Sequence, residues 1–250
     1  MNGLATLLLL VPLAPALDAQ IGSTVGPPVA PLGCPIAIAM SNDGLVDTSL
    51  ADACPFEVHT AAGVVVFDLS CPTLVPIPLG VGDTVVSHWD LTDNFGQPVL
   101  PGDYLVSVEV PIGPPQVHKV KLGGPAAALA QLGVTHIGTA RHFELCAPQD
   151  PGLPYLLAAA FSSTPPIQTC AGQLPLAADA LFFLSLQPSA VFVGFSGTLD
   201  AQGRSTVPAL AVPNDPGLVG ISFVLGYVVI DLAQTCPIRT ISAPLPIKIH

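Results

Sequence analysis

The sequence predicts an all-β protein in which two antiparallel, Ig-like β-sandwich domains follow a signal peptide. The first observation is that 23 Gly and 29 Pro divide the apolar residues into short runs, as turns do in a many-stranded protein. The second is the segment from His88 to Val110, which has the pattern of a strand, a polar turn, a Pro-Gly corner and an alternating second strand. No long amphipathic helix pattern interrupts the strand candidates. Short strands at such spacings are typical of β-sandwiches.

The composition permits a large hydrophobic core and argues against binding to nucleic acid. Half of the 250 residues are apolar and only 9% are charged. Six Lys and Arg residues stand against 17 Asp and Glu residues, which gives a formal net charge of −11. Because a chain with this charge repels a phosphate backbone, we expect no nucleic-acid partner. The length suits one large domain or two of ordinary size.

Residues 1–19 have the outline of a signal peptide. The apolar stretch from Leu4 to Leu17 is too short to span a bilayer comfortably, which takes about 20 residues. Small residues at Ala14–Ala16 and at Ala19 offer two cleavage sites, although no Lys or Arg precedes the apolar stretch. We expect a secreted protein, extracellular or periplasmic, with no transmembrane span after signal cleavage. Residues 20–33 follow as an extended leader.

Residues 34–122 are predicted to form the first sandwich domain. Its strand candidates, in chain order, are residues 35–40, 56–60, 63–69, 83–91, 102–110 and 116–122. Asp43-Gly44, after the first of them, is a hairpin-type turn signal. Residues 76–82 are rich in Pro, which cannot donate to a sheet ladder, so we expect an edge strand or a connection there.

A change of composition at Gly123-Gly124-Pro125 marks the predicted domain boundary. Residues 123–135 are predicted to be a linker or a short helix, and residues 136–250 the second sandwich domain. The strand candidates of this domain are residues 141–146, 155–162, 180–186, 190–199, 204–210, 220–230 and 243–249. Turn signals lie at 149–152 and at 200–203, and the second predicts a hairpin between the strands on either side of it.

The six cysteines fit an oxidising compartment. They are Cys34, Cys54, Cys71, Cys146, Cys170 and Cys236, and none forms the C-x-x-C pair of redox and zinc sites. Six cysteines allow 15 connectivities, among which sequence cannot choose. Three lie in each half, so complete pairing requires at least one bridge between the halves. We predict Cys54–Cys71 and Cys146–Cys170, with Cys34 and Cys236 either paired or free.

Residues 34–110 contain the landmarks of a known domain type. Phe56-Glu57-Val58-His59 precedes Ala62–Phe67, and Leu79–Asp83 precedes Trp89-Asp90 and Gly102-Asp103-Tyr104. This order resembles the BsuPI-type intracellular proteinase inhibitor domain. The Trp-Asp to Pro-Gly-x-Tyr ending is also similar to the Ig-like domain of flagellar hook-capping proteins. The resemblance implies an Ig-like sandwich and, for the first family, protease inhibition.

The landmark residues have structural roles in this prediction. They are Trp89, Asp90, Gly96, Pro101, Gly102 and Tyr104. Trp89 is expected to fill the core, Gly96 to allow a turn with positive φ, and Tyr104 to bond its hydroxyl to the backbone, as in a tyrosine corner. Pro101-Gly102 turns the chain into the next strand. None of these is an inhibitory contact, so residues 74–79 are the one loop that we nominate for protease inhibition.

The second half also resembles a known module. Residues 194–204, followed by Val207-Pro208 and Pro216–Gly220, are similar to a C-terminal β-module of large bacterial secreted proteins. No activity comes with that module, so this resemblance implies export and a β fold.

Candidate sites for chemistry are few. Asp90, Asp93 and Asn94 crowd one polar turn and are weak calcium candidates. Their spacing departs from that of an EF-hand loop, and Asx side chains that cap their own turn are the ordinary explanation. The sequence has no nucleophile elbow and no local metal-ligand spacing of His. We therefore expect no catalytic residues, no enzyme activity and no cofactor.

These observations favour a secreted, non-enzymatic protein with a structural, adhesive or protein-interaction role in the cell envelope or extracellular space. Its partners would be other proteins or an envelope surface, bound through sheet edges or apolar patches. The alternative is a protease inhibitor that acts through the first domain. The third hypothesis is a carbohydrate-binding module. Such modules usually bind sugars through exposed aromatic side chains, and this chain has only one Trp and three Tyr.

Overall fold

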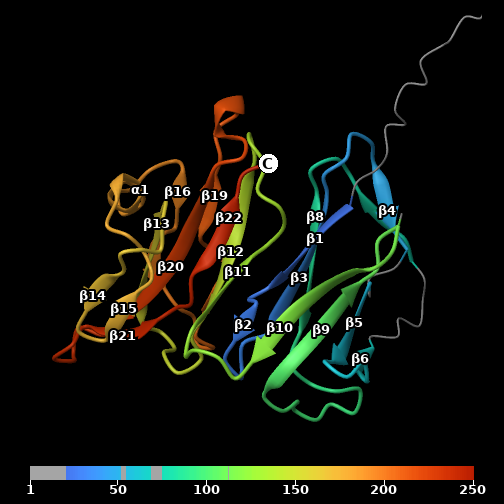
Figure 1. Ribbon diagram of the computed structural model, residues 1–250, viewed down its shortest axis with the longest axis horizontal. Helices are drawn as coiled ribbons and strands as arrows, with labels where there is room; N and C mark the ends of the chain where they lie inside the picture. Colours follow the sequence, from blue (N-terminus) through green and yellow to red (C-terminus); the bar gives the residue numbers. More distant parts are fainter. Residues whose placement is uncertain (1–20, 52–54, 69–74, 112) are drawn as a thin grey trace, which may run out of the picture.

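A computed structural model describes residues 21–51, 55–68, 75–111 and 113–250 (Figure 1). The predicted signal peptide and the predicted Cys54–Cys71 bridge lie outside these ranges. Within them the chain is all-β: short, mostly antiparallel strands form several sheets, accompanied by one short α-helix and one 3₁₀ turn. The sheets form two groups, each around its own hydrophobic core. We name them the N-terminal unit (residues 21–122) and the C-terminal unit (residues 127–249).

The N-terminal unit consists of two sheets and a small ribbon. The first sheet is antiparallel, in the order β1 (Ile21–Gly26), β3 (Ile36–Asn42) and β8 (Thr84–Trp89). The second has the order β2 (Val29–Ala30), β10 (Gln116–Leu122), β9 (Gly102–Val108), β5 (Phe56–Thr60) and β6 (Val65–Asp68). In this sheet β2 runs parallel to β10, and the other pairs are antiparallel. The ribbon pairs β4 (Thr48–Leu50) with β7 (Ile77–Leu79).

The two sheets of the N-terminal unit pack face to face over one hydrophobic core. Alternate residues of each strand point into this core, for example Ile36 and Ile38 of β3 and Val106 and Val108 of β9, all fully buried. The period of two in these segments is the pattern from which their strands could be predicted.

The C-terminal unit also has two main sheets. One has the order β11 (Ala128–Gln131), β12 (Ala140–Cys146), β19 (Ala209–Ala211) and β16 (Phe192–Val193), with β18 (Arg204–Ser205) also paired to β12. The other has the order β17 (Ser196–Thr198), β13 (Pro154–Ala160), β20 (Ser222–Ile230) and β21 (Ile238–Ile241), with β22 (Leu245–Lys248) also paired to β20. A hairpin joins β14 (Ile167–Thr169) to β15 (Gly172–Leu174), and the helical segments are α1 (Ala180–Ser185) and the 3₁₀ turn η1 (Pro216–Leu218).

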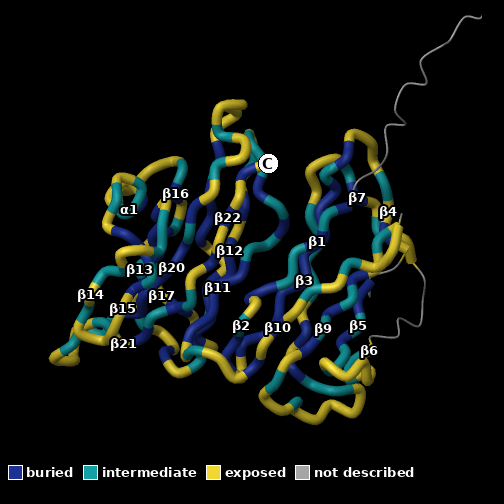
Figure 2. Tube along the Cα trace, in the orientation of Figure 1, coloured by how far each residue is buried: buried dark blue, intermediate teal, exposed yellow. Residues whose placement is uncertain are grey.

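Strands β13 and β20 are buried on both faces (Figure 2). Their inward side chains, such as Leu157 and Leu225, belong to the core between the two sheets. Their outward side chains, such as Ala158 and Val228, form a second cluster to which Phe182 of α1 contributes. Helix α1 therefore serves as a cover for this sheet. Among the described residues, no helix is long and apolar enough to cross a membrane.

The predicted extended leader contains a strand of the first sheet. β1 pairs with β3 along its whole length, from Ile21 opposite Asn42 to Gly26 opposite Ala37. The N-terminal unit therefore includes residues that the prediction placed before residue 34. In the sequence Ile-Gly-Ser-Thr-Val-Gly, two glycines, which are depleted in strands, offset the β-branched residues, which are enriched in them. Its conformation depends on the hydrogen bonds that β3 supplies.

Two further predictions of secondary structure were wrong. Residues 123–135, predicted as a linker or short helix, contain strand β11, which pairs with β12. Residues 180–186, predicted as a strand, form helix α1. The Asp179 carboxylate caps this helix by accepting a hydrogen bond from Phe182 N at 3.0 Å. A short apolar run fits either a buried strand or a buried helix, so here the cap and the packing decide.

The predicted strand at 190–199 is divided between two sheets. β16 pairs with β19, whereas β17 pairs with β13. Between them Gly194 has a φ of +63°, which a residue with a side chain rarely adopts. An added Cβ there would also lie 2.8 Å from Val207 Cγ1. The glycine thus lets the chain cross from one sheet to the other.

Neither predicted hairpin turn joins two paired strands. The turn at 200–203 connects β17 to β18, which pair with β13 and β12. Asp43-Gly44 connects β3 to β4, which pairs with β7. Both turns lead from one sheet to another, because long-range pairing and not the turn residues selects the partner strand.

Candidate functional site

Strand β3 lies between the two units and is buried on both faces. Its large side chains point into the N-terminal core, so by alternation Ala37, Ala39 and Ser41 face the other way, and all three are at most 1% exposed. This sheet lies beside β11 and β12 (Figure 1). An added Cβ on Gly26 of β1 would lie 3.5 Å from the Ala130 Cβ of β11. The two units therefore approach each other through small side chains.

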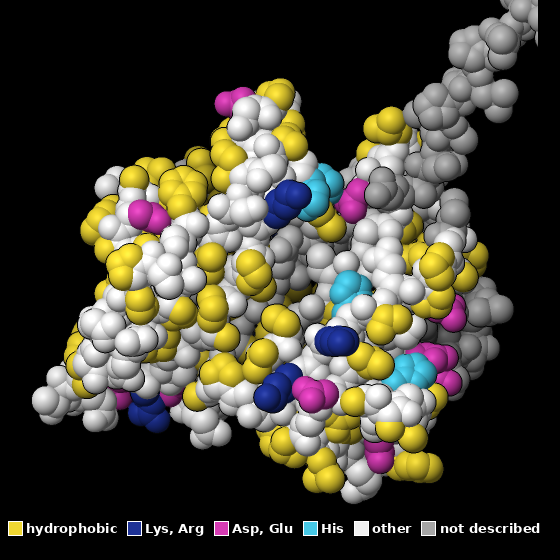
Figure 3. Space-filling model, in the orientation of Figure 1, with side chains coloured by type: hydrophobic (Ala, Val, Ile, Leu, Met, Phe, Trp, Pro, Cys, Tyr) yellow, Lys and Arg dark blue, Asp and Glu magenta, His cyan; other side chains and the backbone are white. Residues whose placement is uncertain are grey.

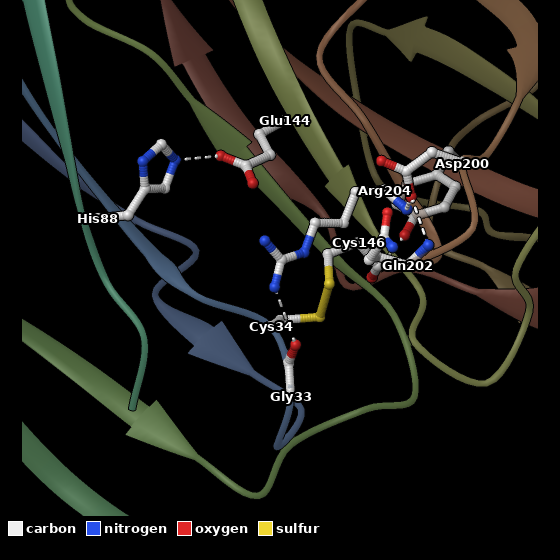
Figure 4. Close-up of a disulfide and its surroundings, with 9 residues drawn as sticks. Gly33, Cys34, His88, Glu144, Cys146, Asp200, Gln202 and Arg204 are labelled. Carbon is white, nitrogen blue, oxygen red and sulfur yellow. Dashed lines mark hydrogen bonds and ion pairs between the residues drawn. A yellow bond between two sulfur atoms is a disulfide. The ribbon is translucent and has the colours of Figure 1, made fainter. Parts of the chain in front are cut away.

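A disulfide bond links the units at this junction (Figure 4). Cys34, which precedes β3, is bonded to Cys146 at the end of β12, with the two Cα atoms 5.8 Å apart. Both cysteines are buried, and they form a small apolar cluster with Ala128. The bond joins residues 112 positions apart in the sequence. It supplies the bridge between the halves that complete pairing requires.

The predicted Cys146–Cys170 bridge is wrong. Cys170 is bonded to Cys236, with a Cα separation of 5.7 Å, so Cys34 and Cys236 do not pair either. This second bridge ties the hairpin β14–β15 to the segment before β21. Proximity in sequence misled the prediction, because the end of β12 lies at the junction and there faces Cys34.

Polar side chains join the two units along β3 and its neighbours. The contacts that cross the junction include three with an ionisable side chain on the C-terminal unit: His88 Nε2 to Glu144 Oε2 at 2.8 Å, His136 Nε2 to Asp43 Oδ1 at 2.9 Å, and Arg141 Nη1 to Thr84 Oγ1 at 2.7 Å. Burial lowers the pKa of the Arg141 guanidinium, and the nearby Asp43 carboxylate opposes that shift. Figure 4 shows the His88–Glu144 pair beside the disulfide. Each of these contacts joins a side chain of the N-terminal unit to an ionisable side chain of the C-terminal unit.

The landmark segment of the N-terminal unit has a structural role. Trp89 is fully buried, donates from Nε1 to the Thr92 carbonyl at 2.8 Å, and meets the Tyr104 ring edge to face at 5.4 Å. Tyr104 donates its hydroxyl to the Leu100 carbonyl at 2.7 Å, and burial raises the pKa of this phenol. Gly96 has a φ of +73° within the turn. Pro101-Gly102 leads directly into β9.

The side-chain oxygens of the three calcium candidates accept backbone hydrogen bonds, those of Asp90 and Asp93 within their own turn and that of Asn94 from the end of β6. Asp90 Oδ1 accepts from Thr92 N and Oγ1, Asp93 Oδ1 from Phe95 N and Gln97 N, and Asn94 Oδ1 from Asp68 N. Asx caps explain Asp90 and Asp93, and Asn94 ties the turn to β6. In the part of the chain that the structure describes, no three His, Cys, Asp or Glu side chains are grouped to hold a metal ion.

The loop nominated for protease inhibition is largely a strand. Residues 77–79 form β7, which pairs with β4, and Leu79 is 1% exposed. Of the described part of this loop, Val75, Pro76 and Pro78 are exposed. The aromatic side chains considered for sugar binding are also buried: Trp89, Tyr104, Tyr155 and Tyr227 are at most 7% exposed. These observations therefore support neither the protease-inhibitor hypothesis nor the carbohydrate-binding hypothesis.

An apolar pocket opens on the C-terminal unit, and no feature of the sequence indicated it. Its volume is about 320 Å³. Its walls include Leu181 and Leu184 of α1, Val191 and Phe192 beside and in β16, and Leu218 of η1. Because these residues come from separate segments, only the folded chain brings them together.

A histidine inside the N-terminal unit gives a testable pH dependence. His118 Nε2 lies 2.8 Å from the Ser23 hydroxyl, which donates to Gln116 Oε1. Burial lowers the pKa of His118 in the folded protein. As pH falls below about 6.5 the unfolded chain therefore binds the proton first, and stability is lost down to the lower folded-state pKa.

We expect the urea midpoint of the wild type to fall more steeply than that of H118Q as the pH is lowered from neutrality to about pH 5. Above the unfolded pKa this contribution is fully present, so the difference between the two proteins should be constant there. Parallel midpoints over the whole range would show that His118 does not titrate in this way.

Comparison with known proteins assigns no family to this chain. No protein-family model and no curated protein matches it. Among solved structures, red sea bream transglutaminase has 12% identity and a TM-score of 0.28, over 93% of this chain and 31% of that chain. The native conformation of E. coli alpha-2-macroglobulin has 14% identity and a TM-score of 0.30, over 94% of this chain and 14% of that chain. The chain thus spans under a third of either protein, and likenesses at these TM-scores support no argument about function.

Proposed function

We propose that this chain is a secreted, non-enzymatic protein of the cell envelope or extracellular space that binds other proteins or an envelope surface. In this proposal the two units are Ig-like β-sandwich domains that act as one rigid body. The observation that supports it most directly is the junction, where the Cys34–Cys146 bond crosses between the units beside the doubly buried strand β3. Two β-sandwich domains in a fixed relative orientation can present a binding surface without a conformational change.

The disulfides support the proposed location. Cys34–Cys146 and Cys170–Cys236 are of the kind that persists in secreted and periplasmic proteins, where the thiol-reducing systems of the cytosol are absent.

The surface available for binding lies at the lower end of the N-terminal unit in Figure 1. Phe95 and Leu100, in the loop before β9, are 86% and 77% exposed. Val64 and Val65, in the β5–β6 hairpin, are 62% and 48% exposed. The loop is held against β6 by a hydrogen bond from Asn94 N to the Val66 carbonyl at 3.1 Å. We name these four exposed side chains the apolar tip.

The apolar tip leads to a binding prediction. Burying a Phe and a Leu side chain stabilises a complex by about 1.5–3 kcal/mol each, so F95S/L100S should weaken binding at least about tenfold. The measurement is retention of the purified protein on envelope fragments of its source cells. V81S/V117S is the matched control, because both valines are more than half exposed but lie outside the tip.

Retention of the wild type and of V81S/V117S, together with loss of F95S/L100S, would support the proposal. Equal retention of all three proteins would show that the tip is not the binding surface. If the wild type inhibited a protease at stoichiometric concentration, this result would contradict the proposal and show that the protein is a protease inhibitor.

A further inference from the structure

The apolar pocket of the C-terminal unit has the features of a ligand site. It lies beside α1 and η1, and its walls include side chains of the inter-sheet core such as Phe192, Leu210 and Phe223. Its volume of about 320 Å³ lies within the range of small-molecule sites, about 300–1,000 Å³. Figure 3 shows apolar side chains gathered on this face, between α1 and the loop at the top of the view. The pocket thus gives access from solvent to the hydrophobic core.

The surface that the pocket walls expose is apolar. Ser189 is the one polar residue in the lining, and its hydroxyl oxygen accepts a hydrogen bond from Phe192 N at 3.0 Å. A peptide segment placed here would lose the hydrogen bonds of its backbone to water without replacing them, which is unfavourable for each buried N–H and C=O group. The walls therefore favour a ligand portion made of hydrocarbon.

Two carboxylates lie beside segments that line the pocket. The Asp179 carboxylate accepts from Phe161 N at 2.8 Å, and Phe161 is part of the rim. Asp215 caps η1 by accepting from Gly217 N at 2.9 Å, next to the lining residue Leu218. No Lys or Arg belongs to the lining. An anionic head group, such as that of a free fatty acid, would therefore find no ion-pair partner in the pocket walls, and these two carboxylates are close to them.

We propose that this pocket binds the hydrocarbon chain of an uncharged, lipid-like molecule. The chain enters between the two sheets, and the uncharged head group stays in solvent at the rim formed by Phe161 and Leu184, which are 55% and 53% exposed. This site is independent of the apolar tip, which belongs to the other unit.

The chain-length dependence of binding tests this assignment. The probes are octanol, decanol, dodecanol and tetradecanol, each below its solubility limit, titrated into the full protein and followed by the methyl NMR signals of Ile, Leu and Val. Each methylene that enters the pocket should tighten binding about three- to fourfold, until the pocket is full and the gain stops. The shifted signals should be those of Leu181, Val191, Leu218 and Ile221, with none from the N-terminal core.

A matched pair of variants locates the site. V191F places a larger side chain in the pocket and should weaken dodecanol binding at least tenfold. V219F makes the same change at a neighbouring residue that is 52% exposed and lies outside the lining, and should bind as the wild type does. Thermal unfolding of both variants checks that they are folded.

Three results would overturn the proposal. They are the absence of saturable binding by any of the alcohols, affinity that does not change with chain length, and tighter binding of dodecanoate than of dodecanol. The last result would show that an anionic lipid is preferred in spite of the two carboxylates.

Discussion

Replacing Cys34 and Cys146 together by alanine should lower the free energy of unfolding by about 4–5 kcal/mol. The bond closes a loop of 112 residues, and a cross-link over about 100 residues removes that much entropy from the unfolded chain. Alanine suits both positions, because the two cysteines are buried in a small apolar cluster with Ala128. Urea unfolding, followed both by far-UV circular dichroism and by the fluorescence of Trp89, measures the change.

The same variant should also separate the unfolding of the two units. Trp89 is in the N-terminal core, so its fluorescence reports on that unit, whereas circular dichroism reports on both. The control is C170A/C236A, which removes a bond confined to the C-terminal unit and should leave the junction intact. If the midpoint of C34A/C146A equalled that of the wild type by both probes, the disulfide would not hold the units together.

Replacing Trp89 by alanine should cost about 3–5 kcal/mol of stability, as removal of a large buried aromatic side chain does. Trp89 is the largest of the fully buried side chains, and the substitution also removes its hydrogen bond to Thr92 and its edge contact with Tyr104. Chemical unfolding of the variant and of the wild type, followed by far-UV circular dichroism, measures this loss of stability.

The matched control is F95A in the same segment. Phe95 is 86% exposed, so its removal should change stability by no more than about 0.5 kcal/mol. Losses of similar size for the two variants would mean that the segment is not packed as described.

The N-terminal unit could be predicted in outline because its strands alternate. Strands such as β5 (Phe56–Thr60) and β10 (Gln116–Leu122) were predicted at the bounds that the structure gives. Strand β1 was not, because its Gly-rich sequence is a strand only when paired with β3. Helix α1 was predicted as a strand, although Asp179 before it was a usable cap signal.

The junction and the pocket were beyond prediction for a physical reason. The alternation of Ile, Ala and Met in β3 places small side chains on one face, but what covers that face depends on strands about a hundred residues away. The pairing of Cys34 with Cys146 follows from the same arrangement and not from spacing. The pocket likewise assembles residues from 161 to 249, none of which is unusual in its own segment.

The most direct test of the account is whether the two units tumble as one body. Backbone ¹⁵N relaxation of the full protein gives a rotational correlation time for each unit separately. With the Cys34–Cys146 bond and the contacts of His88, His136 and Arg141 in place, both units should share one correlation time, that of the whole protein. Two different and shorter times, each that of an isolated unit, would contradict the rigid junction on which the proposed function depends.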